Sequence, residues 1–445
     1  MKYTLCFLGI LILLFSSCAD KLKIGEDQST SFIKFYGNMW VDNGNDVKNI
    51  PVSKTFPNGG YAIAGYTTKT INRNPGDKDM LFLILDRFGN IVGKPKQYGG
   101  PGDDEATRVD VLANGAGFIL TGFRTIHDTL HASVMRLNSA GDSVWNYISS
   151  IPGSSAEKAL NIHIDSATNI YTVVGYQTQN NQNGWIFDLQ DKGDHYIYNG
   201  SSFNSNIFQV LQYYNTSTAL SYNLNTEFID IGILSSNSVF LLGSLTLPIG
   251  TGIPVLYRSA EFDATKQVTY VIGNNDWVSA LIRKINDSPK QMIILPGNKS
   301  ALLSSIDTIN TSTHFVHLAI LNDPANPTSS QSSNWYYFDA TAGFNGGSLD
   351  AVKMKFNVKD STFIILATLI PSTSSTNSSI ILIKADGRLQ GKEIWRRTLG
   401  NNDLYVAGGL DFTPDGGYIV TGYNNTGGYN QAVLVIKTNQ DGFIE

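Results

Sequence analysis

The sequence predicts an all-β protein, a seven-bladed β-propeller closed by an N-terminal strand that completes the C-terminal blade. A strand-rich motif recurs seven times along the chain, and only 16% of the residues are charged, while 42 are glycine and 11% are aromatic. The two ends of the predicted domain also complement each other, as a closed ring requires. Because repeats can build one large domain from small units, the 445 residues need not divide into several domains.

The clearest copy of the repeat is the last one. It runs from Asp411 through a turn to a strand that ends in Gly422, and continues with a strand from Ala432 to Lys437. A residue equivalent to Gly422 is found in each earlier repeat: Gly65, Gly122, Gly175, Gly243, Gly297 and Ala367. The third strands begin near Leu81, Ser133, Trp185, Val255, Phe315, Ile380 and Val433. Four short strands per repeat favour a propeller, because one blade cannot bury both faces until its neighbours stack against it; a solenoid is the alternative.

The ends of the domain indicate how the ring closes. The seventh repeat lacks an outer strand, because the sequence stops at Glu445 just after its third strand. The segment 32–38, Phe-Ile-Lys-Phe-Tyr-Gly-Asn, matches the outer strand of the preceding repeat, 395–401, in length and in its Gly-Asn ending. We therefore expect the N-terminal strand to complete the C-terminal blade, which would remove an exposed sheet edge, and we expect a single domain over residues 31–445.

The repeat also carries a family resemblance. With a Gly-Gly-Tyr strand at Gly416-Gly417-Tyr418 and Asp-Gly turns such as Asp386-Gly387, the chain resembles repeat-built bacterial propeller lipoproteins and is similar to kelch- and quinoprotein-like propellers. The motifs are strong at residues 55–145 and 380–445 and weak between 195 and 350. The resemblance implies a propeller and a cell-envelope location, and it implies no activity, because such folds carry many functions.

Residues 1–30 resemble the export signal of a bacterial lipoprotein. An apolar run from Leu5 to Phe15 is too short to span a bilayer as a helix, and it leads into Phe15-Ser16-Ser17-Cys18, which is similar to a lipobox. The resemblance implies a signal peptide over 1–17, lipidation of Cys18 and a polar tether over 18–30; ordinary secretory cleavage is the alternative. We expect a lipid-anchored protein of the cell envelope, at the outer membrane on its periplasmic or surface face. Cys6 and Cys18 are the only cysteines, so the predicted domain has no disulfide and no thiolate metal site.

Charge and loop composition indicate the class of function. The formal net charge of −5 argues against a nucleic-acid protein, which usually carries a basic surplus. Connections on one face of the predicted ring are short Gly-rich turns, and those on the other face are long. The longest, from Asn199 to Glu227, places aromatic residues among Asn, Ser and Thr: Phe203, Phe208, Tyr213, Tyr214 and Tyr222. This composition is typical of a surface that stacks on sugars or docks a partner, although an insertion packed over a blade edge would look the same.

Our first hypothesis is therefore a monomeric, non-enzymatic binding or scaffold lipoprotein. It would engage an envelope protein or a glycan through the loop-rich face. The alternative is a carbohydrate-active hydrolase or lyase with a shallow site on the same face.

The sequence predicts no catalytic residue and no cofactor. His127 and His131 lie in a predicted loop without the glutamate of a metalloprotease helix, and His314 and His317 are expected on opposite faces of a strand. We assign no metal ligand, although acidic residues from several blades could gather at the pore and bind calcium there. A glycosidase would need one non-repeated pair of carboxylates, and none stands out.

Two other groups favour structural roles. Asp103 and Asp104 open the first strand of the second repeat, and Asn and Asp recur at 274–276 and 401–403, which predicts capping of backbone amides. His163, on an inner strand, is expected to be a hydrogen-bonded structural histidine.

Overall fold

The computed structural model describes residues 31–37, 40–69, 77–179, 182–203, 225–235, 238–246, 252–259, 269–271, 285–297, 299–308, 314–321, 333–340, 347–371, 377–388, 391–400, 404–425 and 431–444. These residues form strands almost throughout, and the single helical element among them is the short 3-10 turn η1 (Ala113–Gly115). The all-β prediction is therefore confirmed. No helix in the described part of the chain is long and apolar enough to cross a membrane.

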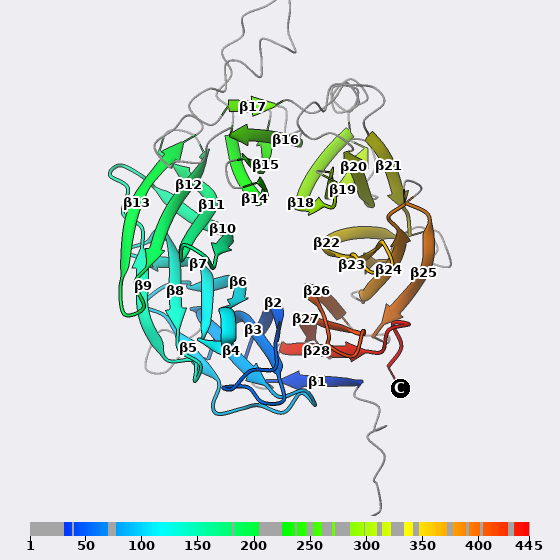
Figure 1. Cartoon of the computed structure of the whole chain (residues 1–445), viewed down its shortest axis with the longest axis horizontal. Helices are drawn as coiled ribbons and strands as arrows, with labels where there is room; N and C mark the ends of the chain where they lie inside the picture. Colours follow the sequence, from blue (N-terminus) through cyan, green and yellow to red (C-terminus); the bar gives the residue numbers. More distant parts are fainter. Residues whose placement is uncertain are drawn as a thin grey trace, which may run out of the picture.

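The sheets are arranged as a ring, with the first strand of each group of four nearest the centre (Figure 1). The first sheet contains β2 (Asp42–Ile50), β3 (Gly60–Thr67), β4 (Asp79–Leu85) and β5 (Lys96–Tyr98). An eight-stranded sheet follows, formed by β6 (Glu105–Val111), β7 (Phe118–Ile126), β8 (Thr129–Leu137), β9 (Ser143–Ile148), β10 (Ala156–Asp165), β11 (Ile170–Thr178), β12 (Gln182–Asp191) and β13 (Tyr196–Phe203).

Four further four-stranded sheets complete the ring. Two of them are β14 (Asn225–Ser235), β15 (Ser238–Thr246), β16 (Gly252–Ser259) and β17 (Thr269–Val271), and β18 (Ile285–Leu295), β19 (Lys299–Thr308), β20 (His314–Leu321) and β21 (Ser333–Phe338). The third is β22 (Ser348–Asn357), β23 (Thr362–Ile370), β24 (Ser379–Asp386) and β25 (Glu393–Leu399). The last is β26 (Leu404–Phe412), β27 (Tyr418–Asn425) and β28 (Ala432–Thr438), with β1 (Phe32–Tyr36) at its outer edge.

The number of sheets differs from the sequence prediction. Seven separate four-stranded blades were expected, whereas the described chain forms six sheets, because β6–β9 and β10–β13 are joined into one. The junction is a parallel bridge between Ala156, at the start of β10, and Leu130 in β8. The buried carboxylate of Glu157 reinforces the junction. It accepts hydrogen bonds from the backbone amide of Ile151, at 2.9 Å, and from the hydroxyl of Ser149. The prediction of seven separate sheets was wrong at this junction.

The N-terminal strand occupies the place that its sequence predicts. β1 pairs antiparallel with β28, from Phe32 opposite Lys437 to Tyr36 opposite Val433. Its side chains alternate, so that Phe32 and Tyr36 pack against the core while Phe35 is 48% exposed. The Tyr36 hydroxyl also donates a hydrogen bond to the Gly89 carbonyl, 2.5 Å away in the first sheet. β1 therefore holds the two ends of the ring together.

A β-bulge interrupts the innermost strand of every group of four. At each bulge the pairing with the second strand skips one residue: Asn45, Thr107, Leu160, Ile229, Lys290, Val352 and Gly408. The second-strand residue opposite the bulge is small, because the bulged backbone comes close; a Cβ on Gly122 would lie 2.0 Å from the Glu105 carbonyl oxygen. This explains the recurring glycines of the sequence.

Gly297 is the exception among the predicted equivalents. It lies in the turn between β18 and β19 with φ of +77°, and the residue that faces the bulge in this sheet is Ser304. The identification of Gly297 as a second-strand glycine was therefore wrong.

The hydrophobic core lies between neighbouring sheets. Phe82 of the first sheet packs on Phe118 of the next, with ring centroids 4.9 Å apart. Leu366 and Leu382 join a cluster with Leu410 and Val420 of the last sheet. Packing of neighbouring sheets against each other in this way positions the inner strands around the centre.

Candidate functional site

Polar side chains meet at the centre of the ring, one from the residue that follows each bulge. Six of the seven positions carry a polar or charged residue, and the seventh carries glycine: Asp46, Arg108, Asn161, Asp230, Gln291, Lys353 and Gly409. We call this set the central ring.

Most members of the central ring bind the next inner strand. Asp230 accepts a hydrogen bond from the backbone amide of Met292 at 2.8 Å, and Gln291 accepts one from that of Met354 at 2.8 Å. Asn161 donates its side-chain amide to Asp230. At these three bulges the side chain is directed sideways to the neighbouring inner strand, and these contacts hold adjacent sheets in register.

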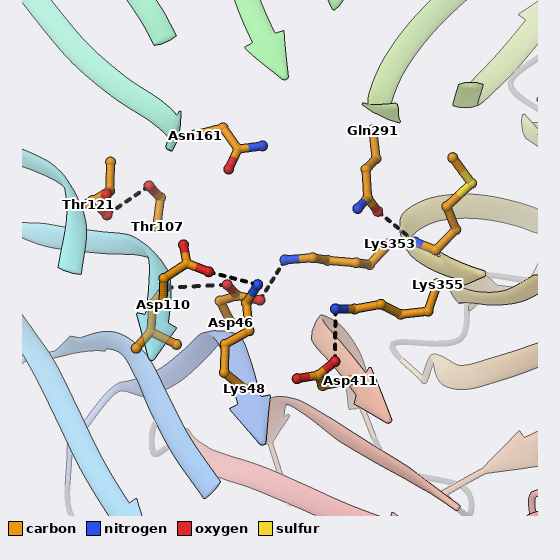
Figure 2. Close-up of polar contacts among 12 residues, drawn as sticks. Asp46, Lys48, Thr107, Asp110, Thr121, Asn161, Gln291, Lys353, Lys355 and Asp411 are labelled. Atoms are coloured by element: carbon orange, nitrogen blue, oxygen red, sulfur yellow. Dashed lines mark hydrogen bonds and ion pairs between the residues drawn. The ribbon is translucent and has the colours of Figure 1, made fainter. Parts of the chain in front are cut away.

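One ion pair extends past a whole strand. The ammonium of Lys353 on β22 lies 2.6 Å from the carboxylate of Asp46 on β2 (Figure 2), although β26 stands between these two strands in the ring (Figure 1). Gly408 and Gly409 let β26 lie close to β2, because they have no side chain. A Cβ on Gly409 would lie 2.6 Å from the Val47 nitrogen. The two side chains are buried, with exposures of 4% and 0%.

The charges of this pair depend on each other. Burial would raise the pKa of Asp46, but Lys353, Lys48 and Arg108 outweigh it and lower that pKa to about 2. Burial, together with Arg108, lowers the pKa of Lys353 to about 7, against the attraction of Asp46. Two more ion pairs lie beside it, Lys48 with Asp110 at 3.0 Å and Lys355 with Asp411 at 2.8 Å. The three ammonium groups and the three carboxylates neutralise one another. We therefore assign these ion pairs a structural role, in which they hold the inner strands together.

A cavity of about 710 Å³ opens on the face of the ring that carries the long connections, where β18, β22 and β26 begin. Its walls come from β18, β19, β20, β22, β23, β26 and β27 and from the segment before β24. Its polar lining includes Ser288, Lys290, Ser305, His314, Asp350, Thr368, Asn377, Ser378 and Tyr423. We call it the loop-face pocket.

A histidine–carboxylate pair lies in the wall of the loop-face pocket. His314 is the first residue of β20, and its Nδ1 lies 2.5 Å from the carboxylate of Asp350 on β22. The backbone amide of His314 also donates to the Ser348 hydroxyl at 3.1 Å, which fixes the start of the strand. Both side chains are partly exposed, 38% for His314 and 34% for Asp350, so a ligand in the pocket can reach them. A histidine held by a carboxylate at Nδ1 exchanges protons through Nε2.

Two further groups of the pocket can carry charge or a proton. Tyr423 on β27 is half-buried, and burial raises the pKa of its hydroxyl. Lys290 is the bulged residue of β18 and lines the same cavity. The pocket therefore combines a candidate base, a candidate acid and a cation in one cavity.

The structure gives the histidines of the sequence analysis separate roles. His317 is 2% exposed, contacts the Ser304 hydroxyl at 3.0 Å and stacks on Tyr337. His131 Nδ1 lies 2.9 Å from the Ser149 carbonyl oxygen, and His127 lies in a turn with φ of +49°. His163 lies on β10, where burial lowers its pKa. The described residues contain no group of three or more His, Cys, Asp and Glu placed to hold a metal ion.

The predicted capping role of the acidic strand entry is confirmed. Asp104 accepts the backbone amides of Thr125, at 2.9 Å, and of Gly100, while Asp103 accepts that of Lys78 at 3.0 Å. The segments 274–276 and 401–403 lie outside the described residues.

The remaining predicted site residues lie mostly outside the described part of the chain. Cys18 is one of these, and so are Phe208, Tyr213, Tyr214 and Tyr222 of the aromatic connection. Phe203 ends β13, where it pairs with Trp185.

Comparison with solved structures shows which type of fold the chain has. No protein-family model matches the chain, and no curated protein matches it. The solved structure of the polysaccharide lyase Uly1 has a TM-score of 0.52 at 9% identity, over 95% of this chain and 94% of its own. An ulvan lyase has a TM-score of 0.53 at 9% identity, over 92% and 97%. An α-L-arabinanase from Penicillium chrysogenum has a TM-score of 0.42 at 10% identity, over 92% and 98%. The two lyases show that the ring belongs to the propeller type, and at 9% identity they show the fold alone.

Proposed function

We propose that the chain is a carbohydrate-active enzyme that cleaves an acidic polysaccharide by elimination in the loop-face pocket. One observation carries the proposal: the cavity brings the His314–Asp350 pair, Tyr423 and Lys290 to one surface. That two proteins of similar fold are polysaccharide lyases supports testing this chemistry first.

Elimination suits these residues better than hydrolysis does. A glycosidase needs two carboxyl groups on either side of the glycosidic bond, whereas Asp350 is the single carboxylate among the described residues of the pocket lining and is engaged with His314. In an elimination a base removes the proton beside the carboxyl group of a uronic acid, a carbon–carbon double bond forms, and the glycosidic oxygen leaves with a proton. His314 would act as the base, Tyr423 would protonate the leaving oxygen, and Lys290 would offset the charge that develops on the uronate.

The test is to incubate the purified protein with uronate-containing polysaccharides and to follow the ultraviolet absorbance of the new double bond. Replacing a general base lowers the rate by about 10²–10⁴-fold, which we expect for His314→Ala. His195→Ala is the matched control, since that histidine is 64% exposed and lies away from the pocket in the β12–β13 turn. If polysaccharide binds but no double bond appears on any of them, the non-enzymatic binding protein is the better account.

We also propose the location and the repeat number that the sequence predicts. A single bridge joins the two halves of the eight-stranded sheet, which supports counting seven four-stranded units in the ring. The lipobox-like segment supports a lipid anchor at Cys18 and a place in the cell envelope. Cys18→Ala should release the protein from the membrane fraction, and retention like that of the parent would contradict the anchor.

A further inference from the structure

We propose that the tight-turn face of the ring rests directly on a lipid bilayer, through an apolar and basic patch next to β1. The patch consists of the β4–β5 turn and the end of the last sheet: Arg87, Phe88, Ile91, Val92, Lys94 and Phe443. We call it the membrane patch.

The large apolar side chains of the patch are exposed to solvent. The exposed fraction is 41% for Phe88, 40% for Ile91, 46% for Val92 and 51% for Phe443. The turn that carries the first three is exposed over most of residues 87–95. Phe88, Ile91 and Val92 gather within one turn, and large apolar side chains that gather on a surface mark an interaction site, whereas isolated ones need no explanation.

Cations frame these apolar groups. Arg87 lies over the Phe88 ring at 4.6 Å, and Arg397 lies over the Phe443 ring at 4.2 Å. Arg87 and Lys94 are exposed, and neither forms an ion pair with a described residue. Apolar side chains between long cationic ones suit a bilayer with anionic lipids, because the rings and branched chains enter the interface while the charges stay at the headgroups.

The fold does not require apolar residues at this turn. The equivalent β8–β9 turn carries Asn138, Ala140, Asp142 and Ser143, and the β12–β13 turn carries Lys192, Asp194 and His195. These two turns show no apolar residue larger than alanine, so the fold does not impose the apolar residues at 88–92.

The position of β1 identifies the occupant. Its first residue, Phe32, pairs with Lys437 near the end of β28, so residues 1–30 join the ring on the tight-turn face. Lys34 of β1 also donates to Asn90 of the patch turn at 2.8 Å. The inference rests on the proposed lipid anchor, because an anchor before β1 would bring this face to the membrane. The loop-face pocket would then face away from the bilayer, toward polymer in solution.

Hydrogen–deuterium exchange of the full chain, with an excess of vesicles containing phosphatidylglycerol and with none, tests the inference. We expect the backbone amides of residues 87–93 and 441–444 to exchange several-fold more slowly on vesicles, and those of the loop-face turn 152–155 to be unchanged. The triple variant F88S/I91S/V92S should lose this protection, whereas Ala140→Ser, at the equivalent position of the next turn, should keep it.

The outcomes separate the patch from the anchor. The anchor is tested in the F88S/I91S/V92S background, where the patch is removed: failure of the added Cys18→Ala change to leave the membrane fraction would contradict the anchor alone, since the exchange measurement with excess vesicles does not need the lipid. Equal exchange at 87–93 with and without vesicles, or protection of 152–155 instead, would overturn the membrane patch. Protection that grows with protein concentration in the absence of vesicles would indicate a second copy of the chain, and would also overturn it.

Discussion

Lys353 and Asp46 form a buried pair whose two charges are needed together. Asp46→Asn keeps the shape of the side chain and removes the counter-ion of Lys353, which is 4% exposed; without Asp46 the pKa of Lys353 falls further, so the buried lysine must either lose its proton or stay charged without this partner. Breaking such a pair costs about 3–5 kcal/mol of the free energy of unfolding. The double variant D46N/K353M should recover part of this loss in denaturant titrations. Lys96→Met, which breaks an exposed pair with Asp142, is the control and should cost less than about 1 kcal/mol. A single variant no less stable than this control would refute the structural role of the pair.

The same carboxylate predicts an acid-sensitive part of the stability. Its pKa is lowered from 3.8 to about 2 in the folded protein, so the unfolded chain binds more protons between these values. The contribution of Asp46, about 2 kcal/mol, is therefore complete above pH 3.8 and is lost as the pH falls toward 2. The difference in unfolding free energy between parent and Asp46→Asn should shrink across this window, and a constant difference from pH 5 to pH 2 would be the opposite result.

At this scale the sequence predicts local roles and misses long-range ones. Asp104 caps the nearby amide of Gly100 and was identified from its pattern, whereas the bonds of Asp103 to Lys78 and of Asp104 to Thr125, 25 and 21 residues away, could not be read from that pattern. His314 was considered only with His317, because its partner Asp350 lies 36 residues away on another sheet. The central ring takes one residue from each inner strand, so its members share no local motif and only their position after the bulge could have revealed them.

The bulged inner strand is the element that gives the chain its repeating glycines. Gly65, Gly122 and Gly175 face bulges, and a Cβ on each would lie within 2.0 Å of a backbone oxygen. The sequence could reveal this requirement because it recurs at one place in each repeat. It could not separate Gly297 from that series, because a turn also selects glycine and the strand position itself is filled by Ser304.

The contact between β26 and β2 should be sensitive to a single methyl group. A Cβ on Gly408 would lie 2.0 Å from the Gly44 carbonyl oxygen, which is backbone and cannot turn aside. We expect Gly408→Ala to lower the unfolding free energy by about 3 kcal/mol, as overpacking does. Gly93→Ala is the comparison, because its φ is +76° but its Cβ would meet nothing within 4 Å, so only the backbone strain of about 1 kcal/mol applies. Equal losses in the two variants would show that the strands can move apart.

For the whole molecule, the closing strand has one inward and one outward face. Phe32 packs on Tyr61 of the first sheet with centroids 6.4 Å apart, while Phe35 is 48% exposed. The sequence predicts the pairing of β1, but its run of apolar residues does not say which side is buried. Phe32→Ala should lower the unfolding free energy by about 1–2 kcal/mol, and Phe35→Ala should change it by less than about 0.5 kcal/mol, in thermal or denaturant unfolding. Equal effects would contradict the alternation.

Removal of the whole closing strand tests the ring as a unit. Deleting residues 31–38 would free the edge of β28 over Val433 to Lys437 and would also remove the Tyr36 hydrogen bond to Gly89, so the junction would lose contacts to both neighbouring sheets at once. An open β-edge pairs readily with other chains, and we therefore expect a lower melting temperature together with aggregation that increases with concentration. Deleting residues 21–30 instead leaves every one of these contacts in place and should do neither. If both deletions melted like the parent, the packing of β27 and β28 on β2 and β3 in their shared hydrophobic cluster, rather than β1, would be what closes the ring.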